Sequence, residues 1–444
     1  MKLNYKRTFL VGLAFLSISA FWQLYDGVIP KILTRTFGLG ESITGVFMAA
    51  DNVLALFLLP LFGSLSDKCR SRLGRRMPFI VGGTLAAVIL MNLLPLLDNR
   101  YFTAPSTLTT VLFVITLFLL LVAMSTYRSP AVALMPDVTP KPLRSKGNAV
   151  INLMGACGGI LYLLVSSLLY SSDKVAGFSH VNYQPLFFVV SALMALSVLV
   201  LTLTIPERKL AGEVDAYEAQ HPEENLEEVD EHGAGVLPKP VKKSLIFLLL
   251  SVALWYIGYN AITTWFTTYA DEMWGMALGD ANLCLTIAMA GAIVSYLPVG
   301  IIASRVGRKK SILFGVALLA LSFGSCIVYT LVAEGFSPIL YVVFVLVGVA
   351  WATINVNSLP MVVEMCRGSD TGKFTGYYYA FSMAAQVVTP IVAGSLMEHI
   401  SYNALFPYAT AAVCLAFVTM LFVHHGDNRV VAKRGLEAFE DLDA

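Results

Sequence analysis

The chain has 444 residues, of which 57% are apolar and 13% are charged, whereas soluble domains carry roughly 45–50% apolar and about 25% charged residues. Its mean hydropathy is +0.73, and 30 basic residues balance 29 acidic ones. This composition argues against a soluble enzyme, a secreted disulfide scaffold and a nucleic-acid-binding protein. It predicts an integral membrane protein whose partner is the lipid bilayer.

Apolar runs long enough to span a bilayer follow one another along the chain, separated by polar breaks. The first half is expected to hold spans at Thr8–Pro30 (with a continuation to Leu39 left open), Ile43–Leu65, Phe79–Leu97, Leu108–Tyr127, Ala149–Tyr170 and Leu186–Ile205. The second half is expected to hold spans at Ser244–Tyr269, Ala281–Ala303, Ile312–Val332, Ile339–Met365, Phe374–Met397 and Ala404–Val423. The prediction is an all-α polytopic protein with twelve transmembrane helices.

The domain organisation follows from these runs. We expect an N-terminal six-helix bundle at 1–205, a C-terminal bundle at 244–425 and a cytoplasmic tail at 426–444. Residues 206–243 are rich in acidic residues and end in glycine and proline, which predicts a partly helical cytoplasmic linker.

Orientation follows from the basic residues, because cytoplasmic loops retain Lys and Arg. With the N-terminus inside, 25 of the 30 basic residues fall in cytoplasmic segments and 4 in outer loops. Arg128 is left within a span. We therefore expect a multi-pass protein of the plasma membrane with both termini in the cytoplasm.

A loop motif occurs in both halves. The segment from Gly63 to Arg76 and the segment from Gly300 to Lys309 both fit G-x-x-x-(D/S)-(K/R)-…-G-R-(R/K). Such loops project cations that can pair with acids and helix ends of the neighbouring bundle while the cytoplasmic side is closed. The predicted cytoplasmic gate consists of Gly63, Asp67, Arg75, Arg76, Asp137, Gly300, Arg305, Arg308 and Glu364.

Twelve spans in two six-span repeats with this loop resemble the major facilitator superfamily over the whole chain. Residues 63–80 are similar to the signature of plant sucrose carriers and of animal solute carrier family 45. Residues 130–137 are similar to the fourth-span motif of the glycoside–pentoside–hexuronide group, which includes melibiose carriers. The resemblance implies cation-coupled uptake of a glycoside, most often by proton symport.

Three positions depart from these families. Arg128 stands where melibiose-type carriers have an acid that helps bind sodium, and Val111–Met124 holds no acid where plant sucrose carriers have one. Ser304 replaces the acid that is usual in the second loop motif. We therefore expect the proton rather than sodium as the coupling ion.

Ionisable groups inside a bilayer are costly, so each is a functional candidate. Asp26 and Asp51 are the candidate proton-coupling acids, and Arg128 is expected to form a charge pair. Our hypothesis gives the proton to Asp26 and pairs Asp51 with Arg128. An exchange of the two roles is left open.

Sugars are bound by aromatic faces and by amide or carboxylate groups that converge in a mostly apolar cavity. Residues of these types recur at helical spacing in several spans. The predicted substrate-binding residues are Trp22, Tyr25, Tyr127, Tyr256, Asn260, Trp351, Asn355, Asn357 and Gln386.

The sequence holds no G-x-x-x-x-G-K-[ST] nucleotide motif and no nucleophile constellation, and its six cysteines lie far apart. We expect no enzyme activity, no cofactor and no metal. The prediction is a monomeric secondary active transporter that moves a di- or oligosaccharide of the sucrose or maltose type by alternating access. The alternatives are a carrier or uniporter for another small solute, and a transporter-fold sugar sensor.

Overall fold

The structure is a computed structural model, and it describes residues 3–140, 143–220, 238–333, 335–365 and 371–427. Within these ranges the chain forms helices and no β-strand, and twelve helices are long and apolar enough to cross a membrane. The predicted all-α polytopic class is confirmed. The chain divides into unit 1 (residues 1–39 and 50–226) and unit 2 (residues 40–49 and 227–444).

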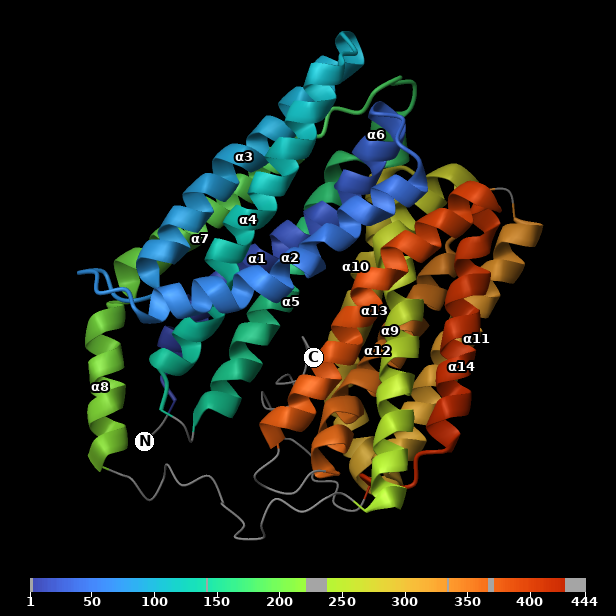
Figure 1. Ribbon diagram of the computed structural model, residues 1–444. Coiled ribbons are helices and arrows are strands. Elements are labelled where there is room, and N and C mark those ends of the chain that lie inside the picture. Colours follow the sequence, from blue (N-terminus) through green and yellow to red (C-terminus); the bar gives the residue numbers. More distant parts are fainter. Residues whose placement is uncertain (1–2, 141–142, 221–237, 334, 366–370, 428–444) are drawn as a thin grey trace. The chain divides into compact units, whose positions relative to one another are not determined.

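The first half of the chain is coloured blue to green in Figure 1. Its elements are α1 (Tyr5–Lys31), the π-helical η1 (Ile32–Thr36), α2 (Glu41–Asp67), α3 (Met77–Thr103), α4 (Thr107–Asp137), α5 (Arg144–Leu169), the short α6 (Ser172–Val175), α7 (Gln184–Thr204) and α8 (Glu207–Gln220).

The second half runs from yellow-green to red. Its elements are α9 (Lys239–Trp274), α10 (Leu278–Val306), α11 (Arg308–Val332), α12 (Ile339–Glu364), α13 (Thr371–His399), the 3-10 turn η5 (Tyr402–Ala404) and α14 (Leu405–Leu421).

The helices of the two units pair in the same order. In unit 1, α1 packs on α5 and α7, and α3 packs on α4 and α7. In unit 2, α9 packs on α13 and α14, and α11 packs on α12 and α14. These are equivalent pairs when the spans are counted from the start of each half. The predicted six-helix pseudo-repeat is therefore present in the structure.

Glycine permits the closest of these helix contacts. A Cβ atom on Gly158 of α5 would overlap the backbone carbonyl of Leu16 in α1, and one on Gly348 of α12 would overlap the carbonyl of Ala288 in α10. Small residues let helix backbones approach closely in this way in membranes.

Several helices extend beyond the predicted spans. The first continues through Pro30 to Thr36, so Asp26 lies well inside it. The helix of the fourth predicted span, α4, ends at Asp137 instead of Tyr127, and the helix of the seventh, α9, begins at Lys239 instead of Ser244. Hydropathy marks the bilayer core alone, whereas a helix continues into polar sequence wherever its charged side chains find partners.

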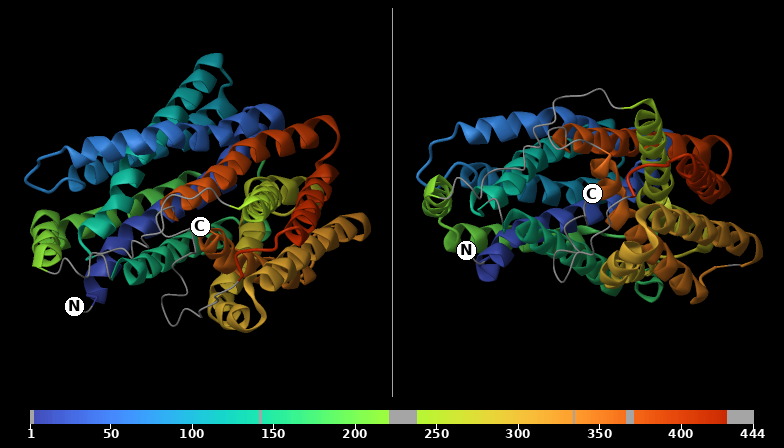
Figure 2. Two further views of the ribbon diagram at one scale, coloured as in Figure 1. Left: turned by 60° about the horizontal axis from the view of Figure 1, so that its bottom comes forward. Right: turned by 90° about the horizontal axis from the view of Figure 1, so that it is seen from below.

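The predicted linker begins as a folded element. Helix α8 buries Leu210 and Val214 and lies beside the α2–α3 loop at one end of unit 1 (Figure 2). Glu213 pairs with Arg7 at 3.7 Å, and Glu218 pairs with Arg144 at 3.3 Å. The rest of the linker, 221–237, and most of the tail, 428–444, lie outside the described residues.

Candidate functional site

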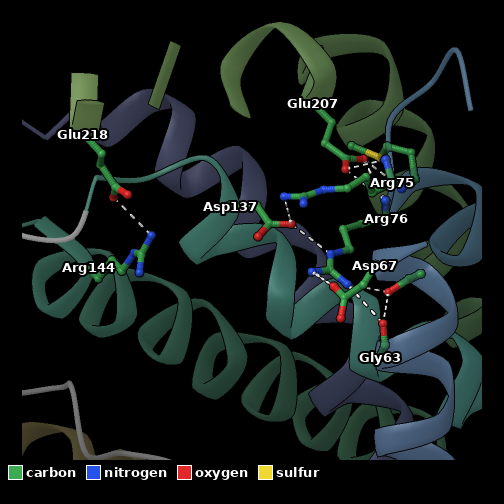
Figure 3. A network of polar contacts seen from close by, with 10 residues as sticks. Gly63, Asp67, Arg75, Arg76, Asp137, Arg144, Glu207 and Glu218 are labelled. Atoms are coloured by element: carbon green, nitrogen blue, oxygen red, sulfur yellow. Dashed lines mark hydrogen bonds and ion pairs between the residues drawn. The ribbon is translucent and has the colours of Figure 1, made fainter. Parts of the chain in front are cut away.

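Arg76 is the centre of a charged cluster where α2, α3 and α4 meet (Figure 3). Its guanidinium group pairs with Asp67 at 2.5 Å and with Asp137 at 2.8 Å, and it donates to the carbonyl oxygen of Gly63 at 3.3 Å. Arg75 reaches the same Asp137 carboxylate at 3.3 Å. Burial opposes the charge of Arg76, but the bonds and charges of its two acids outweigh burial and raise its pKa.

Glu207, the first residue of α8, caps the start of α3. Its carboxylate accepts hydrogen bonds from the backbone N–H groups of Arg75 (2.7 Å), Arg76 (2.9 Å) and Met77 (2.9 Å), and it is 1% exposed. The carboxylate also lies against Gly74, which has φ +124° and leaves no room for a Cβ. A helix N-terminus presents unpaired N–H groups and a positive dipole, so a carboxylate is a well-matched cap.

The Glu207→Ala variant is expected to lower the thermal unfolding temperature of the purified protein. A hydrogen bond to a charged group contributes about 1.5–3 kcal/mol, and this substitution removes the acceptor of three buried N–H groups. Glu213→Gln on the same helix is the matched control, because an exposed ion pair contributes about 0–1 kcal/mol. Equal unfolding temperatures for both variants would contradict the capping role.

Unit 2 repeats the arrangement with different residues. The Arg308 guanidinium pairs with Glu364, and the Arg308 backbone N–H donates to the carboxylate of Asp427 at 2.5 Å. Gly307, at φ +96°, lies against that carboxylate as Gly74 does against Glu207. Asp427 thus caps α11 as Glu207 caps α3.

Two members of the predicted gate stay outside these clusters. Arg305 is exposed and forms no ion pair within the described residues, and Gly300 lies inside α10 with Val356 nearby. The Ser304 hydroxyl donates to the carbonyl of Ile301 in its own helix, so it does not replace the missing acid.

The pairing of the loop cations also differs from the prediction. Asp137 and Glu364 were expected to meet cations of a neighbouring bundle, but each pairs with the loop of its own unit. The reason is that α4 and α12 end beside the loops that start α3 and α11.

A second group of polar residues lies within the membrane-spanning part of unit 1. Asp26 and Asp51, from α1 and α2, interact electrostatically, and Asp51 also interacts with Arg128 of α4. The Arg128 guanidinium lies 5.7 Å from the ring centre of Trp22, and that ring contacts Tyr25 edge-on at 5.6 Å. The structure thus brings together five of the six residues that were predicted for coupling or substrate binding in the spans of unit 1.

The two acids are compensated differently. Asp51 accepts a hydrogen bond from the Asn52 side chain at 2.9 Å and lies near a guanidinium group. No hydrogen bond or ion pair reaches the Asp26 carboxylate within the described residues.

Tyr127 does not join this group. It is fully buried, and its hydroxyl donates to the carbonyl of Ala14 at 3.0 Å and lies 2.6 Å from the Ser17 hydroxyl. The prediction that Tyr127 binds substrate is not supported by this placement, because its hydroxyl is already used to join α4 to α1.

Unit 2 holds a cluster of aromatic rings built from three helices. The rings of Tyr259 (α9) and Trp351 (α12) stack at 3.6 Å and 3°. Tyr256 contacts Trp351 edge-on at 5.2 Å and Tyr378 of α13 at 6.4 Å. The Tyr378 hydroxyl is 2.9 Å from that of Ser358.

Amide side chains lie on the same three helices. Asn260 is next to Tyr259 in α9, and its Nδ2 has no hydrogen-bond partner among the described residues. Asn355 lies one turn after Trp351 in α12 and is 1% exposed, and its Oδ1 has no partner in the same part of the chain. Asn357 differs, since its Nδ2 donates to the Thr353 carbonyl at 2.9 Å. Gln386 of α13 is half-buried and forms no hydrogen bond among the described residues.

Sequence reasoning missed several of these residues. The capping acids Glu207 and Asp427 each come shortly after the last membrane-spanning helix of their half. An acid at this matched position in both halves is a sequence signal that could have identified them. Ser358 was not among the predicted substrate-binding residues, although its hydroxyl lies beside that of Tyr378. Asp98, at the end of the third apolar run, is fully buried, with His180 Nε2 3.6 Å away.

Two units built on one helix pattern, with charged loop clusters and polar groups inside membrane-spanning helices, define a polytopic membrane transport protein. The chain belongs to the major facilitator superfamily, whose family model matches residues 11–277 and 272–440. The superfamily predicted from the loop motifs is confirmed.

Individual relatives match parts of the chain. Sucrose transport protein SUC3 of Arabidopsis thaliana is 32% identical over 152 residues, which are 32% of this chain and 25% of that protein. Solute carrier family 45 member 3 of Homo sapiens is 27% identical over 194 residues, 43% of this chain and 35% of that protein. These relatives lie in the predicted branch, and each match spans well under half of the relative's length.

The fold is also found among solved structures. A bacterial homologue of the iron transporter ferroportin superposes with a TM-score of 0.69 and covers 95% of this chain and 99% of its own, at 13% identity. At that identity the likeness shows the fold alone.

Proposed function

We propose that this chain is a proton-coupled symporter of a glycoside, a di- or oligosaccharide of the sucrose or maltose type, that works by alternating access. The relatives that are sucrose transport proteins support the substrate class. The distribution of basic residues supports cytoplasmic termini, uptake of an external sugar calls for the plasma membrane, and the repeat of two units within one chain supports a monomer.

The observation that carries the proposal is the group of aromatic and amide side chains in unit 2. Stacked aromatic rings present the flat apolar surface that the C–H face of a sugar ring requires. Asn260 and Asn355 add a donor and an acceptor that no group in the described part of the chain satisfies. Buried polar atoms are nearly always paired, so an unpaired donor and acceptor beside a ring platform are suited to sugar hydroxyl groups.

The coupling ion is assigned from unit 1. Two carboxyl groups that interact inside the membrane repel each other when both are charged, and one bound proton relieves that repulsion. Arg128 brings a fixed positive charge to this region and no oxygen ligand for a metal ion, so the proton is the coupling ion that we propose. The charged clusters around Arg76 and Arg308 fix the loops of each unit, so that the helix ends at the gate move together with them.

Uptake of labelled sucrose and maltose into proteoliposomes tests the proposal. An imposed pH gradient, acidic outside, is expected to drive accumulation, and a protonophore is expected to abolish it. A sodium gradient without a pH gradient and protein-free liposomes are the controls. Uptake of neither sugar would contradict the substrate class, and uptake indifferent to the pH gradient would contradict the coupling.

A further inference from the structure

A pocket of about 660 Å³ opens where α7 ends and α8 begins, next to the α2–α3 loop of unit 1. Three cationic side chains line it, together with apolar residues and a glycine. The lining consists of Arg72, Leu73, Met77, Thr202, Ile205, Pro206, Arg208, Lys209 and Gly212.

The charge of this pocket is uncompensated. No acidic residue lines it, and no acid pairs with Arg72, Arg208 or Lys209 in the described part of the chain. A neighbouring pocket of about 430 Å³ shares Arg208 and is also lined by the cations Arg70 and Arg75, but three acids, Asp67, Glu207 and Asp215, offset their charge. The acids disfavour an anion in the second pocket, so the first is the anion-binding candidate.

The apolar part of the lining indicates what kind of anion fits. Helix α7 is a membrane-spanning candidate that ends at Thr204, and its Leu203 is 76% exposed, as expected of a lipid-facing side chain. Leu73 on the loop is 53% exposed beside the cations. The pocket therefore has a basic part and an apolar part at the level where the helix leaves the bilayer. A lipid with an anionic headgroup and acyl chains matches both parts.

We propose that the pocket between the α2–α3 loop and α8 binds the headgroup of an anionic phospholipid. The phosphate contacts Arg72, Arg208 and Lys209, and the glycerol and upper acyl chains lie against Leu73 and Ile205. A lipid bound there bridges the loop and α8, the two elements that Glu207 also joins.

Native mass spectrometry of the purified full-length protein, titrated with phosphatidylglycerol in neutral detergent, tests the proposal. The triple variant Arg72→Gln/Arg208→Gln/Lys209→Gln is expected to bind phosphatidylglycerol on the order of 100-fold more weakly than wild type, since each cation near a lipid surface contributes about a fivefold factor. The matched control neutralises Lys239, Lys242 and Lys243, three exposed lysines at the start of α9.

Wild-type affinity in the control variant is the expected result. Equal weakening in the control would show a general charge effect and overturn the site, as would equal binding of phosphatidylcholine and phosphatidylglycerol by wild type. If an excess of inorganic phosphate fully displaces the lipid, the pocket is a site for small anions and the lipid proposal is wrong. If the triple variant does not fold, Arg72→Gln alone is expected to weaken binding about fivefold, and unchanged binding would overturn the proposal.

Discussion

The Asp26→Asn variant is expected to lose gradient-driven accumulation of sugar while it keeps exchange of sugar across the membrane. Exchange needs no net movement of the proton, so a carrier whose coupling acid is permanently neutral can still exchange. The accumulation ratio in proteoliposomes with an imposed pH gradient should fall to about 1, the value for equilibration without coupling.

The assignment of the coupling role to Asp26 rests on the unequal surroundings of the two acids. Asp51 has a hydrogen bond from Asn52 and a nearby guanidinium group, so its negative charge is compensated. Within the described part of the chain Asp26 has neither, and its electrostatic neighbour Asp51 is itself an acid. A charged carboxyl group without compensation in a membrane interior is costly, so its neutralisation by a proton lowers the free energy most.

Asp51→Asn serves as the comparison. It should impair both accumulation and exchange, because it leaves Arg128 without its acid inside the membrane, and Asp51→Asn/Arg128→Gln should recover exchange. Accumulation by Asp26→Asn at the wild-type ratio would show that the proton is carried elsewhere. If Asp51→Asn instead loses accumulation and keeps normal sugar exchange, then Asp51 is the proton-coupling acid.

The sequence was sufficient for the features that depend on composition and periodicity. Apolar length predicted the twelve spans, and the repeated loop motif predicted the pseudo-repeat. The motif did not predict that Asp137 and Glu364 pair with Arg76 and Arg308 of their own unit instead of with a neighbouring bundle. Such motifs are local, so one sequence shows them.

Contacts between distant segments could not be predicted in the same way. Glu207 accepts from backbone groups about 130 positions away, and a backbone N–H leaves no trace in the residue types of its loop. The acidic composition around Glu207 instead favoured a solvated linker. Tyr127 was chosen as an aromatic residue within a span, but its packing against Ala14 and Ser17 depends on how α1 and α4 cross.

Replacement of Asn355 by Leu, a residue of similar volume, is expected to weaken sugar binding by about 1–3 kcal/mol, or roughly 5–150-fold. The buried Oδ1 of Asn355 has no partner among the residues that the structure describes, so a sugar hydroxyl that donates to it would supply the missing hydrogen bond. Titration of sucrose or maltose against the purified protein measures the change.

The stability of the sugar-free protein separates a binding role from a structural one. An unsatisfied buried polar atom costs about 1–3 kcal/mol, so Asn355→Leu should leave the unfolding temperature without sugar unchanged or raise it. A structural asparagine would behave in the opposite way, with a lower unfolding temperature.

Asn357→Leu on the same helix is the matched variant. Its Nδ2 already donates to the Thr353 carbonyl, so its replacement should change sugar affinity less than that of Asn355. If Asn355→Leu binds sugar as tightly as wild type, then Asn355 does not contact the substrate. The same conclusion follows if the variant binds sugar more weakly and its unfolding temperature without sugar also falls. A greater loss of affinity in Asn357→Leu than in Asn355→Leu would place the sugar on a different face of α12, because two residues two positions apart in a helix point in directions about 200° apart.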